Sequence, residues 1–165
     1  MSTSRLTNIV VAGLGGQGVL KASDILAEAA VNAGLDVKKS EIKGMSQRGG
    51  SVSSDVRFGD LVLSPMVAPG EADFLLVLEP TQVEPHRHYL RPDGVLIAPE
   101  AVDAAALPSR KSLNVALLGV LSAHLPLPED GWMSVLREAF PGDAFEQNRV
   151  AFLIGRNRAN GRKAI

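Results

Sequence analysis

A glycine-rich segment between an apolar run and a helical pattern constrains the fold of this chain more than any other feature. Residues 9–12 form the apolar run, residues 13–18 (Gly-Leu-Gly-Gly-Gln-Gly) have the GxGxxG spacing, and a helical pattern begins at Val19. Glycines permit a tight turn from strand to helix, and the N–H groups at a helix start attract anions. The segment therefore predicts a Rossmann-like α/β fold. Its candidate binding residues are Gly13, Gly15, Gly16, Gln17 and Gly18.

The pattern of apolar residues after the turn predicts a three-layer, mostly parallel sheet. The first helix ends at Gly34, and a strand over 37–42 completes a β-α-β unit with parallel strands. Alternating residues on both sides of Gly59-Asp60 predict an antiparallel β-hairpin over 52–63. Continuous apolar runs at 74–78 and 95–97 are typical of strands that are buried on both faces.

The last third of the chain is predicted to be helical. Residues 113–121 are apolar nearly all round, which predicts a short helix buried in the core or beneath a partner. Asp130 and Asp143 can each cap a further helix. The basic tail over 156–165 is expected to fray. Together these elements predict a single domain over 1–165.

Composition excludes several classes of function. The formal net charge of −1 gives no general attraction for nucleic acid or anionic membranes, so neither is an expected partner. The chain has no cysteine, which excludes thiolate ligands for an iron–sulfur cluster or a cysteine-type zinc site. No apolar stretch reaches the roughly 18 residues needed to span a bilayer, and no signal peptide is evident. A cytoplasmic location is therefore expected.

Two further polar features follow predicted strands and are expected to share a crevice with the glycine turn. Ligands of open α/β sheets bind beyond the carboxyl ends of the strands. A loop after the second strand supplies hydroxyl, amide and guanidinium donors beside paired glycines, a combination that favours binding of a carboxylate or phosphate over a merely solvated loop. These candidate residues are Ser46, Gln47, Arg48, Gly49 and Gly50, together with Glu79 after the long buried strand.

A dinucleotide site and a metal site both lack residues that they require. Dinucleotide binding requires an acidic residue about 20 positions after the glycines, at the end of the second strand. Asp36 lies at the wrong end of that strand, and Glu41 comes late. His86 and His88 have no third ligand and are interpreted as solvated loop histidines, so no metal site is assigned. No catalytic residue is assigned on this chain.

Four segments together give the chain a specific resemblance. They are residues 13–18, residues 44–52 (Gly-Met-Ser-Gln-Arg-Gly-Gly-Ser-Val), Ser64-Pro65, and residues 70–80 (Gly-Glu-Ala-Asp-Phe-Leu-Leu-Val-Leu-Glu-Pro). The chain resembles the gamma-type subunit of 2-oxoacid (pyruvate/ketoisovalerate):ferredoxin oxidoreductases. Within that family it is most similar to the beta subunit of the indolepyruvate:ferredoxin type. The resemblance runs from about Asn8 to the final helix.

The resemblance implies thiamine diphosphate-dependent oxidative decarboxylation of a 2-oxoacid, with coenzyme A accepting the acyl group and ferredoxin the electrons. Thiamine diphosphate, magnesium and iron–sulfur clusters are expected on a large catalytic partner subunit, with none bound by this chain. The chain is then one subunit of a hetero-oligomer and is inactive alone.

Two roles within such a complex remain open from the sequence. The crevice that contains the glycine turn, Arg48 and Glu79 helps to bind the substrate carboxylate or a coenzyme A phosphate, or the subunit is purely architectural. Outside the family, the alternative is an autonomous Rossmann-type NAD(P)- or FAD-binding oxidoreductase, or a nucleotide-binding module.

Overall fold

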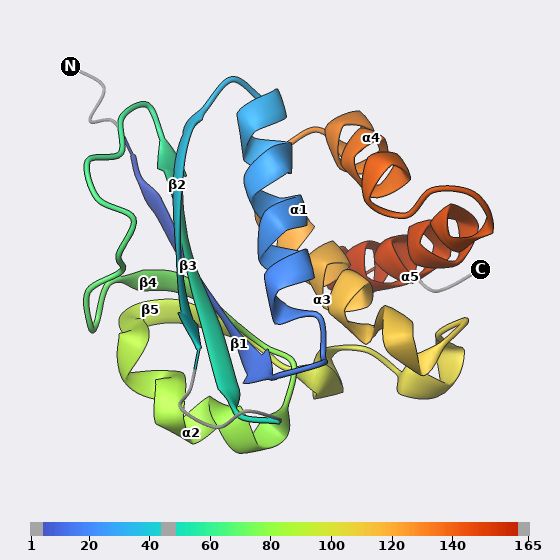
Figure 1. Ribbon diagram of the computed structural model, residues 1–165, viewed down its shortest axis with the longest axis horizontal. Coiled ribbons are helices and arrows are strands. Elements are labelled where there is room, and N and C mark those ends of the chain that lie inside the picture. Colours follow the sequence, from blue (N-terminus) through green and yellow to red (C-terminus); the bar gives the residue numbers. More distant parts are fainter. Residues whose placement is uncertain (1–4, 44–48, 162–165) are drawn as a thin grey trace.

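A five-stranded mixed sheet forms the centre of the protein (Figure 1). The computed structural model describes residues 5–43 and 49–161. The strand order is β2-β3-β1-β4-β5, and β3 alone among the described strands runs antiparallel to its neighbours. The strands are β1 (Thr7–Leu14), β2 (Asp36–Lys43), β3 (Ser51–Gly59), β4 (Ala72–Val77) and β5 (Leu90–Ile97). The predicted α/β fold is confirmed.

Helices cover the two faces of the sheet unequally (Figure 1). The main core lies between one face and the helices α1, α3, α4 and α5, whereas a smaller core lies under α2 on the other face. The helices are α1 (Val19–Asn32), α2 (Val83–His86), α3 (Leu113–Ser122), α4 (Glu129–Ala139) and α5 (Asp143–Ala159). No helix in the described ranges is both long and apolar enough to cross a membrane.

The antiparallel hairpin predicted over 52–63 is wrong in its second strand. β3 pairs with β1 along one edge and with β2 along the other, so no edge of β3 is free for residues 61–63. Those residues form a loop instead, in which the backbone N–H of Val62 donates to Asp36 Oδ2 at 2.8 Å. β3 therefore pairs antiparallel with β2, the strand that precedes it along the chain, and not with the residues that follow it.

The first β-α-β unit also differs from its prediction in one respect. β1 and β2 run in the same direction, as expected, but β3 lies between them. The connection through α1 therefore passes over β3, against which α1 packs. Val56 and Phe58 of β3 fill the space beneath α1 as part of the main core.

The edge strand β5 begins earlier than the predicted strand over 95–97. Ala72 pairs with Leu90 and Phe74 with Val95, so β5 advances five residues where β4 advances two and accommodates three additional residues. These residues include Pro92, which cannot donate a ladder hydrogen bond and is tolerated at a sheet edge. The irregular segment is fixed by an ion pair of 2.8 Å between Arg91 Nη1 and Asp73 Oδ1.

Helix α3 is a core helix, since this chain's own α5 covers it. Every residue from Asn114 to Ser122 is buried. The two helices approach closely at Gly119 and Gly155, where a Cβ atom would lie 2.0 Å from Phe152 O and 1.9 Å from Ala116 O, respectively. Two facing glycines therefore set the separation of α3 and α5.

Helix α5 also includes the start of the tail that was expected to fray over 156–165. It continues to Ala159, and Arg156 Nη1 donates to Ser122 Oγ at 2.9 Å. Arg156 Nε lies 3.3 Å from Glu129 Oε2 of α4. Arg156 therefore joins three helices, and residues 156–159 form the last turn of α5.

The helix crossing makes a direct prediction for stability. Gly119→Ala and Gly155→Ala should each lower the free energy of unfolding by about 3 kcal/mol, because a methyl group forces the helix backbones apart. Urea denaturation followed by the fluorescence of Trp132, the only tryptophan and a fully buried one, measures this change. Gly131→Ala in α4 is the matched control, since its Cβ would meet nothing within 4 Å. Equal stability of all three variants would contradict the close crossing.

Candidate functional site

The connections that follow two neighbouring strands, β1 and β4, leave toward opposite faces of the sheet. β1 and β4 are neighbouring parallel strands, and Leu78 N donates to Ala12 O at 2.8 Å just beyond β4. After β1 the chain enters α1 on the face of the main core, whereas after β4 it enters α2 on the other face. Open α/β sheets bind ligands at such a switch point. The glycine turn and Glu79 both lie there.

Gln17 connects the two strand ends through its side-chain amide. Its Oε1 accepts from Leu14 N at 2.8 Å, which closes the turn, and its Nε2 donates to Glu79 Oε2 at 2.9 Å. The hydroxyl of Thr81 donates to the other Glu79 carboxylate oxygen at 3.4 Å. The structure therefore brings Gln17 and Glu79 together, as their positions after predicted strands suggested.

The structural constraints differ among the four glycine positions of the turn. A Cβ at Gly13 would lie 2.8 Å from Val19 Cγ2 and 2.9 Å from Gln17 Oε1, so Gly13 serves close packing. Gly16 and Gly18 have φ angles of +88° and +83°, which L side chains rarely adopt. Gly15 has neither constraint, because the nearest atom to its Cβ position is Gly49 N at 3.6 Å.

The start of α1 faces the solvent without a side-chain cap. Gly18 is the N-cap residue, no side chain in the described ranges caps the first turn, and that turn contains no acidic residue. The partial positive charge of the helix N-terminus is therefore not offset locally by the described residues. An anion placed at this end would be stabilised by it.

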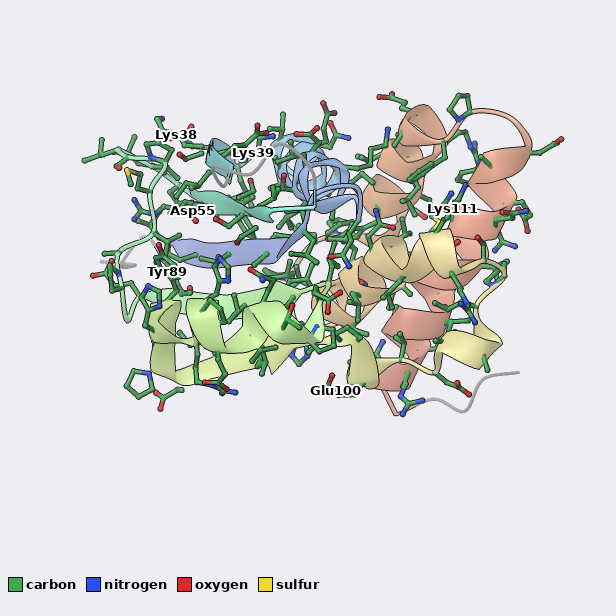
Figure 2. The ribbon with its side chains drawn as sticks, turned by 60° about the horizontal axis from the view of Figure 1, so that its bottom comes forward. Lys38, Lys39, Asp55, Tyr89, Glu100 and Lys111 are labelled. Atoms are coloured by element: carbon green, nitrogen blue, oxygen red, sulfur yellow. The ribbon has the colours of Figure 1, made fainter. Side chains whose placement is uncertain are left out.

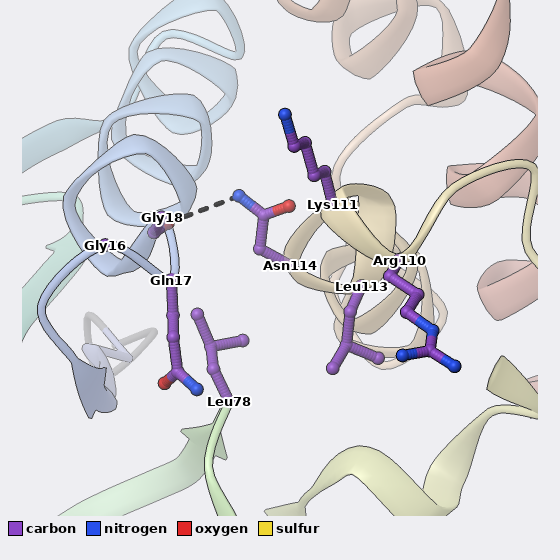
Figure 3. Close-up of a pocket in the computed structure, with 8 residues that line it drawn as sticks. All are labelled: Gly16, Gln17, Gly18, Leu78, Arg110, Lys111, Leu113 and Asn114. Carbon is purple, nitrogen blue, oxygen red and sulfur yellow. Dashed lines mark hydrogen bonds between the residues drawn. The ribbon is translucent and has the colours of Figure 1, made fainter.

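A cavity of about 570 Å³ opens beside this helix start (Figure 3). One wall belongs to the glycine turn and another to the segment that leads into α3, as the close-up shows. The lining residues are Gly16, Gln17, Gly18, Leu78, Arg110, Lys111, Leu113 and Asn114. Two cationic residues therefore line one cavity together with a helix N-terminus, a combination that suits an anionic ligand.

The second wall of the cavity was not predicted from the sequence. Asn114 Nδ2 donates to Gly18 O at 3.3 Å, and Asn114 Oδ1 accepts from Val115 N at 2.9 Å. This buried amide fixes the beginning of α3 against the beginning of α1, and it thereby brings Arg110 and Lys111 to the cavity. Neither cation forms an ion pair with an acidic side chain in the described ranges. The only signal in the sequence was an Arg-Lys pair shortly before a helix that is apolar nearly all round.

The polar loop after β2 can be followed only in part. Ser46, Gln47 and Arg48 lie outside the described residues. Gly50 O accepts from Gly15 N at 2.9 Å, so the end of this loop adjoins the glycine turn. Gly49 and Gly50 therefore lie beside the predicted crevice.

The interpretation that both loop histidines are solvated is wrong for His86 and correct for His88. His86 is buried, with its Nδ1 2.9 Å from Gln82 O and its ring near that of Tyr89, whereas His88 is exposed. The contact with Gln82 O lies within one short helical segment, which is a structural role. No group of three potential ligand side chains capable of holding a metal ion occurs in the part of the chain that the structure describes.

Comparison with known proteins gives one family and several relatives. Residues 8–158 match the family described as pyruvate ferredoxin/flavodoxin oxidoreductase. The chain is 34% identical over 188 residues to the indolepyruvate oxidoreductase subunit IorB of Pyrococcus horikoshii, and the match covers 90% of this chain and 93% of that one.

Two solved structures share the fold. A 2-oxoglutarate:ferredoxin oxidoreductase from Magnetococcus marinus matches with a TM-score of 0.84 at 20% identity, covering 99% of this chain and 32% of that one. The gamma subunit of a keto/oxoacid ferredoxin oxidoreductase from Geobacter sulfurreducens matches with a TM-score of 0.80 at 24% identity, covering 94% and 99%. This chain therefore spans about a third of the Magnetococcus chain. It spans nearly the whole of the Geobacter chain.

The different constraints on the glycines predict different effects of alanine. Gly18→Ala should lower the free energy of unfolding by about 2 kcal/mol, because it adopts a positive φ and its Cβ would lie 2.4 Å from Asn114 Nδ2. Gly15→Ala should change it by less than about 0.5 kcal/mol. Urea denaturation of the two variants, monitored by tryptophan fluorescence, makes the comparison. A loss at Gly15 as large as that at Gly18 would contradict this account of the turn.

Proposed function

The chain belongs to the pyruvate ferredoxin/flavodoxin oxidoreductase family, and on this premise we propose that it is the small subunit of an indolepyruvate-type 2-oxoacid:ferredoxin oxidoreductase. Identity to the Pyrococcus subunit extends over most of both chains and supports the indolepyruvate type. The reaction is the oxidative decarboxylation of an arylpyruvate to an acyl-coenzyme A, with electrons passing to ferredoxin.

The chemistry requires cofactors that this chain is not suited to hold. Iron–sulfur clusters are ligated mainly by cysteine thiolates, and the chain has no cysteine. We therefore assign the clusters, thiamine diphosphate and magnesium to a large partner subunit. This division makes the chain inactive alone and makes its contribution one of binding and assembly.

The cavity at the switch point gives the subunit a part in substrate binding. Both the 2-oxoacid and coenzyme A are anions, through a carboxylate and through phosphates. Arg110 and Lys111 line one cavity at the carboxyl ends of the strands together with the start of α1, and all three contribute positive charge there. The concentration of positive charge in this cavity is the single observation that carries the proposal, since it is where an anionic substrate group is stabilised most.

An autonomous NAD(P)- or FAD-binding function is not favoured. The ribose of a dinucleotide requires an acidic residue beside the glycine turn, at the end of the neighbouring strand. Here β3 separates β1 from β2, and the Glu41 carboxylate of β2 pairs with Lys39 Nζ at 2.8 Å. Asp36 lies at the opposite end of β2, where it binds the N–H of Val62.

Kinetics of the assembled complex test the role of the cavity. The combined variant Arg110→Ala, Lys111→Ala should raise the KM for coenzyme A or for the 2-oxoacid by about tenfold or more, because charge-assisted hydrogen bonds contribute about 1.5–3 kcal/mol each. Steady-state dye reduction with each substrate varied in turn measures both constants. Arg48→Ala tests the neighbouring loop in the same assay.

Arg87→Ala is the matched control, because Arg87 is exposed and pairs with Glu84 at 2.8 Å outside the cavity. Both KM values should remain unchanged in this variant. Unchanged constants in the Arg110/Lys111 variant, with the complex intact, would remove the cavity from substrate binding. Loss of assembly in that variant would indicate an architectural role instead.

A further inference from the structure

The loop between β3 and β4 has an unusual composition for an exposed segment. Residues 61–70 (Leu-Val-Leu-Ser-Pro-Met-Val-Ala-Pro-Gly) contain no charged side chain, although 21% of the whole chain is charged and ten average residues would include about two. The loop lies on the side of the sheet away from α1 (Figure 1). Depletion of charge together with enrichment of methionine is typical of the centre of a protein–protein interface.

Three large apolar side chains of this loop project into solvent. The exposed fractions are 60% for Leu61, 85% for Leu63 and 59% for Met66, whereas the alternating residues Val62 and Val67 are buried. Only two other large apolar residues in the described ranges are comparably exposed, Ile42 and Val31. Leu61, Leu63 and Met66 are therefore three of the five exposed large apolar side chains in the described ranges, and we name them the apolar patch.

The loop is held in place from beneath at three points. Val62 N donates to Asp36 Oδ2 at 2.8 Å, Arg57 Nη1 donates to Ser64 O at 2.7 Å, and Val67 N donates to Asp55 Oδ2 at 2.9 Å. The carboxylate of Asp55 is buried and accepts the hydrogen bond from Val67 N. Pro65 and Pro69 restrict the backbone further. A loop fixed in this way loses little conformational entropy on binding, which favours association.

We propose that the apolar patch docks the large subunit of the same enzyme complex, an assignment that rests on the proposed function. A specific, stable interface engages about 20–30 residues on each side, so a ten-residue loop forms one part of a larger contact surface. A large subunit can add contacts elsewhere on the small one. The same fold forms about a third of a longer chain in the Magnetococcus protein, where it is covalently joined to further polypeptide.

The patch and the cavity lie at opposite ends of the sheet. The loop contacts the start of β2 through Asp36, whereas the cavity lies beyond the carboxyl end of β1. Figure 2 shows the same separation, with Asp55 beneath the loop on the sheet side and Lys111 of the cavity on the helical side. Substitutions in the patch therefore leave the residues that line the cavity unaltered, and the two surfaces can be tested independently.

Binding of the separately purified large subunit to this chain tests the proposal. Leu63→Glu should raise the Kd by at least tenfold, because it places a charge at the centre of an apolar contact. The triple variant Leu61→Ser, Leu63→Ser, Met66→Ser should raise the Kd further. Val31→Glu is the matched control, since Val31 is 56% exposed but lies on α1, and its Kd should equal that of the unmodified chain.

Two additional measurements separate the outcomes. Thermal unfolding of the isolated variants should match that of the unmodified chain, since the altered side chains are exposed. Once assembled at high concentration, the Leu63→Glu complex should retain its KM values. An unchanged Kd in both patch variants would overturn the proposal. A dimer of the isolated chain that Leu63→Glu dissociates, with the Kd for the large subunit unchanged, would overturn it in favour of self-association.

The docking proposal and the proposed function fail in different ways. If the unmodified chain shows no affinity for the large subunit, both are wrong. If the unmodified chain and both patch variants bind equally well, only the docking proposal is wrong. If the patch variants bind weakly while the Arg110/Lys111 variant has normal KM values, only the role of the cavity is wrong.

Discussion

The pairing of β1 with an antiparallel strand on one edge and a parallel strand on the other determines the arrangement of the rest of the protein. Residues 9–12 of β1 are fully buried, so the strand requires cover on both faces. Because β3 occupies one edge, the chain that leaves β1 through α1 passes over β3 before it forms β2. Because β4 occupies the other edge and continues into α2 on the opposite face, a switch point forms at the carboxyl end of β1.

The candidate site depends on contacts between segments far apart in sequence. Gln17 is bonded to Glu79, and Asn114 is bonded to Gly18 across 96 residues. The second contact is possible only because α3 lies in the core, where its separation from α5 is set by Gly119 and Gly155. The position of Arg110 and Lys111 therefore follows from a helix crossing remote from the cavity itself.

The two functional surfaces have opposite chemistry for a physical reason. An anion gains most from fixed positive charge and helix N–H groups in a partly enclosed cavity. Subunit association gains most from apolar area on a backbone that is already ordered. The polar cavity lies at the carboxyl ends of the strands and the apolar patch near the start of β2, so substrate binding and docking need not compete.

Local sequence patterns were sufficient to predict the α/β class, the strand–turn–helix at residues 13–18, the burial of α3 and the proximity of Gln17 to Glu79. These follow from local periodicity, from glycine, and from the rule that parallel strands end at one edge. Tertiary structure alone decided which strand lies beside β1, why residues 61–63 form a loop, and that Arg110 and Lys111 reach the cavity. Local patterns could not show these features, because each depends on which edge or face is already occupied by a distant segment.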